Sequence, residues 1–147
     1  MSTTVETILL YTIAAGFLSI VYGFFTGKNI LNQSSGNAKM QDIASAIQIG
    51  AKAYLTRQYK TIAIVGIVVL VIVSIAFSPL VGLGYLIGAS LSGIAGYVGM
   101  LVSVEANVRT AEASRKGLAQ GLSVAFKSGA VAGMLVAGLA LLSIAVY

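Results

Sequence analysis

Apolar residues fill four long stretches of this chain, and two polar stretches separate the first from the second and the third from the fourth. A helix of about 20 apolar residues is long enough to cross a bilayer. The pattern therefore predicts four transmembrane helices, over about 5–25, 61–77, 80–104 and 122–147. The polar segments 27–60 and 105–120 are expected in the cytoplasm, and residues 1–147 form a single transmembrane domain.

The most polar long stretch, residues 42–61, runs directly into the apolar sequence that begins at Ile62. At helical spacing it has one polar face and a neighbouring apolar face, as an amphipathic helix requires. The polar face holds Ser45, Gln48, Lys52, Thr56 and Lys60, and the apolar face holds Ile43, Ile47, Gly50 and Tyr54. No proline interrupts the passage. We expect one continuous helix that begins in water, crosses the interface near Lys60 and enters the bilayer.

Composition supports this class of protein. The chain is 58% hydrophobic and only 9% charged, whereas soluble domains carry about 25% charged residues. The mean hydropathy is +0.97, which indicates an all-α polytopic membrane protein with lipid as its main solvent. The net charge of +5 raises the question of nucleic acid. The basic residues lie where a positive-inside bias would place them, so no nucleic-acid partner is expected.

The distribution of basic residues predicts an orientation. All nine Lys and Arg lie in the two polar segments, if Lys127 is counted at the membrane edge. None lies near the N-terminus or the Ser78-Pro79 turn. Basic segments favour the cytoplasm, so both termini are expected outside. Glu6 lies at the start of the first apolar run and Lys28 follows the run, which favours a retained helix over a signal peptide. The chain stops inside an apolar run, and we expect a truncated longer protein.

Small residues recur four apart in three of the four predicted spans. Such stripes allow the backbones of neighbouring helices to approach closely, so each predicts a packing face. They are Ala15, Ser19, Gly23 and Gly27; Gly84, Gly88, Ser92 and Gly96; and Gly129, Gly133 and Ala137. The second span is instead crowded with Val and Ile, and we expect it to face lipid.

Catalytic chemistry has few candidate residues here. The chain has neither Cys nor His, which removes thiol chemistry and the commonest metal ligand and general base. None of its four carboxylates lies in the middle of a span, and paired acids or a magnesium cluster would need distant loops to meet. These carboxylates are Glu6, Asp42, Glu105 and Glu112. We assign no catalytic, cofactor-binding or metal-ligating residue, and interpret Arg57, Arg109 and Arg115 as interfacial anchors.

Two small membrane proteins have comparable length and composition. A rotary-ATPase proteolipid has four Gly-rich spans but needs an ion-carrying carboxylate in mid-membrane. A drug/proton antiporter needs a buried Glu, and the one candidate, Glu6, lies too near a helix end. A four-span proteolipid or transporter subunit that acts as an oligomer therefore stays open as the alternative function.

Two polar stretches carry a more specific pattern: IQIGAKAYLTRQY at 47–59 and GYVGMLVSVEANVRTA at 96–111. Together with GLAQGLSVAFKSGAVAGMLVAGLALL, which follows, they resemble the N-terminal part of membrane-bound, ion-translocating pyrophosphatases. The order and spacing match from about Ile43 onward. Two positions depart from the family pattern, since Ile49 stands where Glu is usual and Glu105 stands where a basic residue is common.

The resemblance implies a homodimeric pump with two concentric rings of helices in the plasma (inner) membrane of a prokaryote. Such pumps hydrolyse pyrophosphate on the cytoplasmic side and export protons or sodium. Their Mg²⁺ would be bound by residues outside this chain, and K⁺ is a further candidate cofactor. This stretch would be an outer-ring scaffold without the catalytic motifs. Its expected partners are the lipid bilayer and the remaining helices of the same pump.

Overall fold

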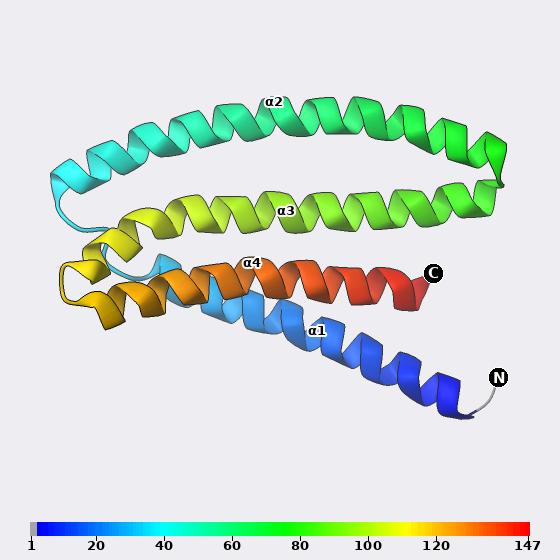
Figure 1. The fold of residues 1–147 in the computed structure, drawn as a ribbon, viewed down its shortest axis with the longest axis horizontal. Helices are drawn as coiled ribbons and strands as arrows, with labels where there is room; N and C mark the ends of the chain where they lie inside the picture. The colour runs from blue at the N-terminus through cyan, green and yellow to red at the C-terminus, as the bar shows by residue number, and fades with distance from the viewer. Residues whose placement is uncertain (1–2) are drawn as a thin grey trace.

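The computed structural model describes residues 3–147 as four long helices joined by short connections (Figure 1). The helices are α1 (Thr3–Leu31), α2 (Ala38–Ala76), α3 (Pro79–Ser114) and α4 (Leu118–Val146). Each is long and apolar enough to cross a membrane. The predicted all-α fold with four membrane-length helices is confirmed.

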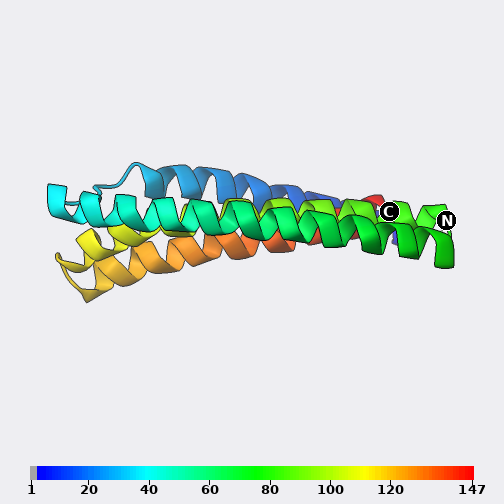
Figure 2. The same cartoon turned by 90° about the horizontal axis from the view of Figure 1, so that it is seen from above.

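The helices pack as a row with α3 and α4 at its centre. In the described residues α2 packs against α3 alone, α3 packs against α4, and α4 packs against α1. A minor contact joins α1 to α3. The view from above shows that all four helices follow one long axis (Figure 2). Thus α2 lies at the outside of the row, with α3 as its single neighbour.

The predicted passage from polar to apolar helix is confirmed, because α2 is one continuous helix of 39 residues. Its N-cap is Asn37, whose side-chain oxygen accepts a hydrogen bond of 3.0 Å from the Met40 N–H and so satisfies a donor without a helical partner. Ser78 does the same for α3 through the Val81 N–H. Pro79 follows at the first position of α3, where the N–H that proline lacks would have no helical partner.

The two polar connections are shorter than the polar stretches of the sequence. Helix α1 continues to Leu31 and α3 continues to Ser114, so only residues 32–37 and 115–117 connect the helices. Each connection contains a glycine with positive φ, 78° at Gly36 and 147° at Gly117. Residues with a Cβ rarely adopt such backbone angles, and glycine therefore permits these tight reversals.

The arrangement of chain ends agrees with the predicted alternation of spans. The start of α1 and the end of α4 lie at the same end of the molecule as the α2–α3 turn (Figure 1). Both polar connections lie at the opposite end. We call this opposite end the loop end, comprising residues 28–44 and 105–124. It carries the basic connections, so the charge asymmetry of the sequence is also an asymmetry between the two ends of the bundle.

The buried core is small and lies near the loop end. Ile30, Ala106, Val124 and Val131 form its buried cluster, contributed by α1, α3 and α4. Most other large apolar side chains are exposed. A soluble protein would not leave so much apolar surface in contact with water. The exposure fits helices that meet lipid or further protein along most of their length.

The predicted packing stripe of α1 is confirmed at three of its four positions. Ser19, Gly23 and Gly27 are buried, whereas Ala15 is exposed and its neighbour Gly16 is buried instead. A Cβ built on Gly23 would lie 3.2 Å from the Leu135 side chain of α4. This face of α1 therefore packs closely on α4, as the small residues predicted.

The predicted stripe of α3 does not face a single neighbour. Gly84 and Gly88 face α4, since a Cβ on Gly88 would lie 3.6 Å from the Ser143 hydroxyl. Ser92 and Gly96 are exposed, and a Cβ on Gly96 would approach the Tyr59 hydroxyl of α2 to 2.7 Å. At 3.6 residues per turn, each step of four drifts by about 40°, or about 120° along this stripe. The stripe thus winds from α4 towards α2, and its assignment to one packing face was wrong.

The predicted stripe of α4 meets no neighbour among the described residues, so its packing role stays a prediction. A Cβ on Gly129 or Gly133 would meet nothing within 4 Å, and Ala137 is exposed. The close contact of α4 instead involves Gly138, where an added Cβ would lie 2.8 Å from the Gly16 carbonyl oxygen of α1. Spacing identified small residues, but it did not identify which face of α4 meets the neighbour.

Candidate functional site

The most connected side chain of the loop end is Arg109. Its Nε and Nη2 donate hydrogen bonds of 3.1 and 2.9 Å to the Leu31 carbonyl oxygen. Its Nη1 donates to the Glu105 carbonyl oxygen at 2.6 Å and forms an ion pair with Glu105 Oε2 at 3.2 Å. The last carbonyls of a helix lack helical partners, and cations are favourable there. Arg109 therefore caps the C-terminus of α1.

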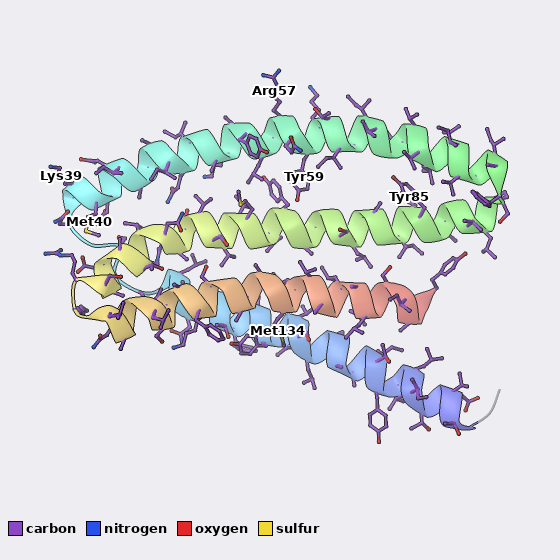
Figure 3. The ribbon with its side chains drawn as sticks, viewed as in Figure 1. Lys39, Met40, Arg57, Tyr59, Tyr85 and Met134 are labelled. Carbon is purple, nitrogen blue, oxygen red and sulfur yellow. The ribbon has the colours of Figure 1, made fainter. Side chains whose placement is uncertain are left out.

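This placement corrects the interpretation of Arg109 as an interfacial anchor. Its side chain is only 14% exposed and is turned into the protein. The spacing of Glu105 and Arg109 at i,i+4 is a sequence signal for their ion pair. No sequence signal indicates the contact with Leu31, which lies 78 residues away in the chain. Arg57, in contrast, points away from the bundle (Figure 3).

The two positions that depart from the family pattern differ in their surroundings. Glu105 is half-buried, and its carboxylate forms an ion pair with the guanidinium of Arg109, so its negative charge is paired within the chain. Ile49 is 68% exposed on α2. Glu105 therefore helps to hold the arginine that caps α1, whereas Ile49 places an apolar side chain on a surface that none of the four helices covers.

A second ion pair joins Arg115 to Glu112 at 3.0 Å, three residues apart at the end of α3. Arg115 is mostly exposed, as an anchor would be, and Glu112 is mostly buried. A Cβ built on Gly36 would lie 3.0 Å from Glu112 Oε2. The connection between α1 and α2 thus passes directly over the end of α3.

A pocket of about 560 Å³ opens between the two connections of the loop end. It lies beside the start of α4 and is lined mainly by polar and charged side chains: Gln33, Ser34, Arg109, Glu112, Lys116, Gln120 and Ser123. Its one carboxylate, Glu112, already pairs with Arg115, and Arg109 already caps α1. Arg109 and Glu112 are thus engaged at helix ends, and the lining contains no unpaired carboxylate that could act as a catalytic acid or base.

Metal ligation can be judged from the donors that the fold brings together. In residues 3–147 no three Asp, Glu, His or Cys side chains form a group that could hold a metal ion. Carboxylate oxygens are the donors that Mg²⁺ requires from a protein. Two of the three carboxylates of the loop end, Glu105 and Glu112, are each paired with an arginine, and the third is Asp42. The absence of magnesium ligands and catalytic residues from this segment stays a prediction.

Four apolar helices of membrane length define an integral membrane protein. Residues 17–147 match the family model of the inorganic H⁺ pyrophosphatase, and the chain belongs to this family. It is 44% identical over 130 residues to a K⁺-insensitive pyrophosphate-energized proton pump of Methanosarcina mazei, covering 87% of this chain and 19% of that protein. It is 39% identical over 129 residues to a putative K⁺-stimulated pyrophosphate-energized sodium pump of Clostridium tetani, covering 88% and 19%.

A third relative, the K⁺-insensitive pyrophosphate-energized proton pump 2 of Moorella thermoacetica, is 38% identical over 132 residues and is likewise covered over 19% of its length. The chain thus spans about a fifth of the length of the curated relatives that it matches. The family match supports the resemblance found in the motifs. It also decides against the proteolipid and antiporter alternatives, because it covers three of the four helices completely and half of α1.

Proposed function

We propose that this chain is the helical scaffold segment of a membrane pump that couples pyrophosphate hydrolysis to the export of protons or sodium. The observation that carries the proposal is the family match over residues 17–147, with relatives that are pyrophosphate-energized pumps. The geometry fits a scaffold, since the small residues of α1 seat α4 and the charged side chains of the loop end tie helix ends together.

The chemistry of such a pump would be located elsewhere in the protein. Pyrophosphate carries several negative charges, and Mg²⁺ ions neutralise and orient such substrates. The carboxylates Glu105 and Glu112 are already paired with arginines. We therefore propose that Mg²⁺ and pyrophosphate are bound by residues outside this segment. A homodimeric assembly, activation by K⁺ and the plasma membrane of a prokaryote as location belong to the same proposal.

The proposal is tested with the full-length pump in inverted membrane vesicles. Addition of pyrophosphate and Mg²⁺ should produce hydrolysis together with either acidification of the vesicle lumen or uptake of ²²Na⁺. The two readouts distinguish a proton pump from a sodium pump. The purified 147-residue chain should show no hydrolysis. Full-length vesicles without hydrolysis would contradict the pump proposal, and fluoride-sensitive hydrolysis by the 147-residue chain would contradict the scaffold proposal.

We further propose that the loop end faces the cytoplasm and that both termini of this segment lie outside. The asymmetry of the basic residues supports this orientation. A reporter that is active only in the cytoplasm, fused after Ser35 or Ser114, should be active. Fusions after Ser78 or Tyr147 should be inactive, and activity after Ser78 would reverse the assigned orientation.

A further inference from the structure

The exposed side of α2 carries two cations that are not neutralised within the described residues. Arg57 and Lys60 are exposed, and Arg57 points away from the bundle (Figure 3). Among residues 3–147 neither side chain forms an ion pair, and the sequence has no Asp or Glu between Asp42 and Glu105. An anion that balances these two charges therefore has to come from outside the four helices.

The two cations are neighbours on the surface of α2. Residues three and four apart in a helix lie side by side, and like charges placed in this way repel each other. Arg57 and Lys60 have this spacing, and no carboxylate of the chain lies between them or one turn away on either side. A single anion placed between the two side chains would convert a repulsive pair into two attractive contacts.

The position of these cations along α2 corresponds to the edge of a bilayer. Helix α2 is continuous from both cations to the turn at Ser78. At 1.5 Å per residue, Lys60 lies about 27 Å and Arg57 about 32 Å from this turn. The hydrocarbon core of a bilayer is about 30 Å thick. With the α2–α3 turn at one membrane surface, both cations therefore reach the headgroup layer of the opposite leaflet.

The helix surface between the cations and the turn favours lipid over a further helix as their neighbour. Four exposed β-branched side chains follow Arg57 on the same face at helical spacing: Ile64, Val68, Val71 and Ile75. The small residues Gly66 and Ser74 lie instead on the side that faces α3. Helix interfaces within membranes are enriched in small residues. The outward face of α2 thus has the composition of a lipid contact, with cations at its headgroup end.

We propose that Arg57 and Lys60 bind the headgroup phosphate of an anionic phospholipid in the leaflet nearer the loop end. The guanidinium of Arg57 can donate two parallel hydrogen bonds to the phosphate, and Lys60 adds a second positive charge. A zwitterionic headgroup carries its own cation beside the phosphate, so the two side chains select anionic lipid. The bound lipid relieves the repulsion between the cations and holds α2 at a fixed depth in the membrane.

The test uses the full-length protein in phosphatidylcholine bilayers with a trace of photoactivatable lipid. Phosphatidylglycerol and phosphatidylcholine probes carry the same diazirine near the headgroup end of one acyl chain, and labelled residues are located by mass spectrometry. A basic residue at an anionic surface contributes about 1 kcal/mol, or about a five-fold preference. We expect phosphatidylglycerol to label residues 57–68 about ten-fold more or better. The measurement requires no pyrophosphate, so its failure leaves the proposed pump function untouched.

Charge-removing variants and two controls sharpen the test. Arg57→Gln and Lys60→Gln should each lower the ratio of phosphatidylglycerol to phosphatidylcholine labelling about five-fold, and the double variant should bring it close to one. Arg57→Lys keeps the charge and should retain most of the preference. Lys39→Gln removes an exposed cation at the start of the same helix and should leave the ratio unchanged. All these positions are exposed, so the variants should fold.

Four results would overturn the proposal. Equal labelling by the two probes in the parent protein would remove the selection of anionic lipid. A preference that survives in the double variant would assign it to other residues. No labelling of residues 57–68 by either probe would show that another part of the protein covers this face and supplies the anion. A preference abolished by inorganic phosphate, but not by chloride at the same ionic strength, would assign the site to a soluble anion.

Discussion

The α1–α4 pair and the α2–α3 pair are both rich in small residues, yet they pack in different ways. Between α1 and α4, a Cβ on Gly16 would lie 2.9 Å from the Gly138 carbonyl oxygen, so the two backbones are in direct contact. Between α2 and α3, the small residues Gly66 and Gly93 meet only tyrosine side chains at ordinary contact distances. Small residues permit close approach, but the residues on the opposite helix decide whether it occurs.

This difference has an energetic consequence in a membrane. Helices gain no hydrophobic energy by pairing in lipid, so their association depends on van der Waals contact and hydrogen bonds. Van der Waals attraction falls steeply when a gap opens between surfaces. The α1–α4 pair should therefore contribute more stability than the α2–α3 pair.

The backbones of the α2–α3 pair come close next to the turn that joins the helices, apart from the side-chain contact of Tyr59 with Gly96. A Cβ built on Gly82 would overlap the side chain of Ser74, which itself donates a hydrogen bond of 2.7 Å to the Leu70 carbonyl oxygen. Helix α2 is therefore held against α3 near the turn and is separated from it by tyrosines farther along. The gap between the two helices is confined to residues 59–70 of α2 and 85–98 of α3 and does not extend along the whole interface.

The largest effect is expected from Gly138→Leu in the full-length protein. A Cβ at this position would lie 2.8 Å from the Gly16 carbonyl oxygen of α1. Overpacking of this kind typically costs about 1–3 kcal/mol. The melting temperature in detergent should fall by several degrees. Gly133→Leu is the matched control on the same helix, because a Cβ there meets nothing within 4 Å. An equal loss in both variants would show that the rest of the protein covers the Gly133 face as tightly as α1 covers Gly138.

A smaller loss is expected from Arg109→Ala, which removes the cap of α1 and leaves Glu105 without its partner. A hydrogen bond to a charged group contributes about 1.5–3 kcal/mol to stability. Because Arg109 is partly exposed, we expect the free energy of unfolding to fall by an amount at the lower end of this range. The measurement is thermal unfolding in one detergent. Arg115→Ala should cost roughly 0–1 kcal/mol, because the Arg115 side chain is mostly exposed. Equal losses would refute a special role for the contact with Leu31.

A modest loss is expected from Tyr59→Ala, because an aromatic pair contributes about 0.5–1.5 kcal/mol beyond its area. The change removes the edge-to-face contact with Tyr97 and one of the tyrosine rings that lie between α2 and α3. Distances between spin labels on α2 and α3 should shorten or broaden relative to the parent protein. Tyr11→Ala, on the exposed face of α1, is the control. An unchanged distance distribution in Tyr59→Ala would show that Tyr59 does not set the distance between α2 and α3.

The smallest effects are expected from Ser92→Leu and Ile75→Leu. Ser92 is exposed although the spacing of small residues predicted a packing role, and Ile75 is 82% exposed. Substitutions at such positions usually change stability by less than about 0.5 kcal/mol. A melting comparison with Gly88→Leu, whose Cβ would lie 3.6 Å from Ser143, tests the corrected face of α3. A loss in Ser92→Leu that equals the loss in Gly88→Leu would restore the original assignment.

The charged contacts of the loop end were predictable only where they are local. Spacing along a helix is enough to pair Glu105 with Arg109 and Glu112 with Arg115. It does not indicate that Arg109 reaches the end of α1, because that contact requires α1 and α3 to meet at one level. The interpretation of Arg109 as an anchor was wrong for this reason.

The sequence by itself determined the number of membrane-length helices, the unbroken passage of α2 from its polar to its apolar half, and the residues that permit close packing. It could do so because lipid leaves the backbone few alternatives to helix and sets the length that each helix needs. Only the tertiary structure decided which face of α3 and α4 meets a neighbour, where Arg109 binds and where a gap between α2 and α3 stays open. Those outcomes depend on the side chains of the opposite helix, and spacing along one helix carries no information about them.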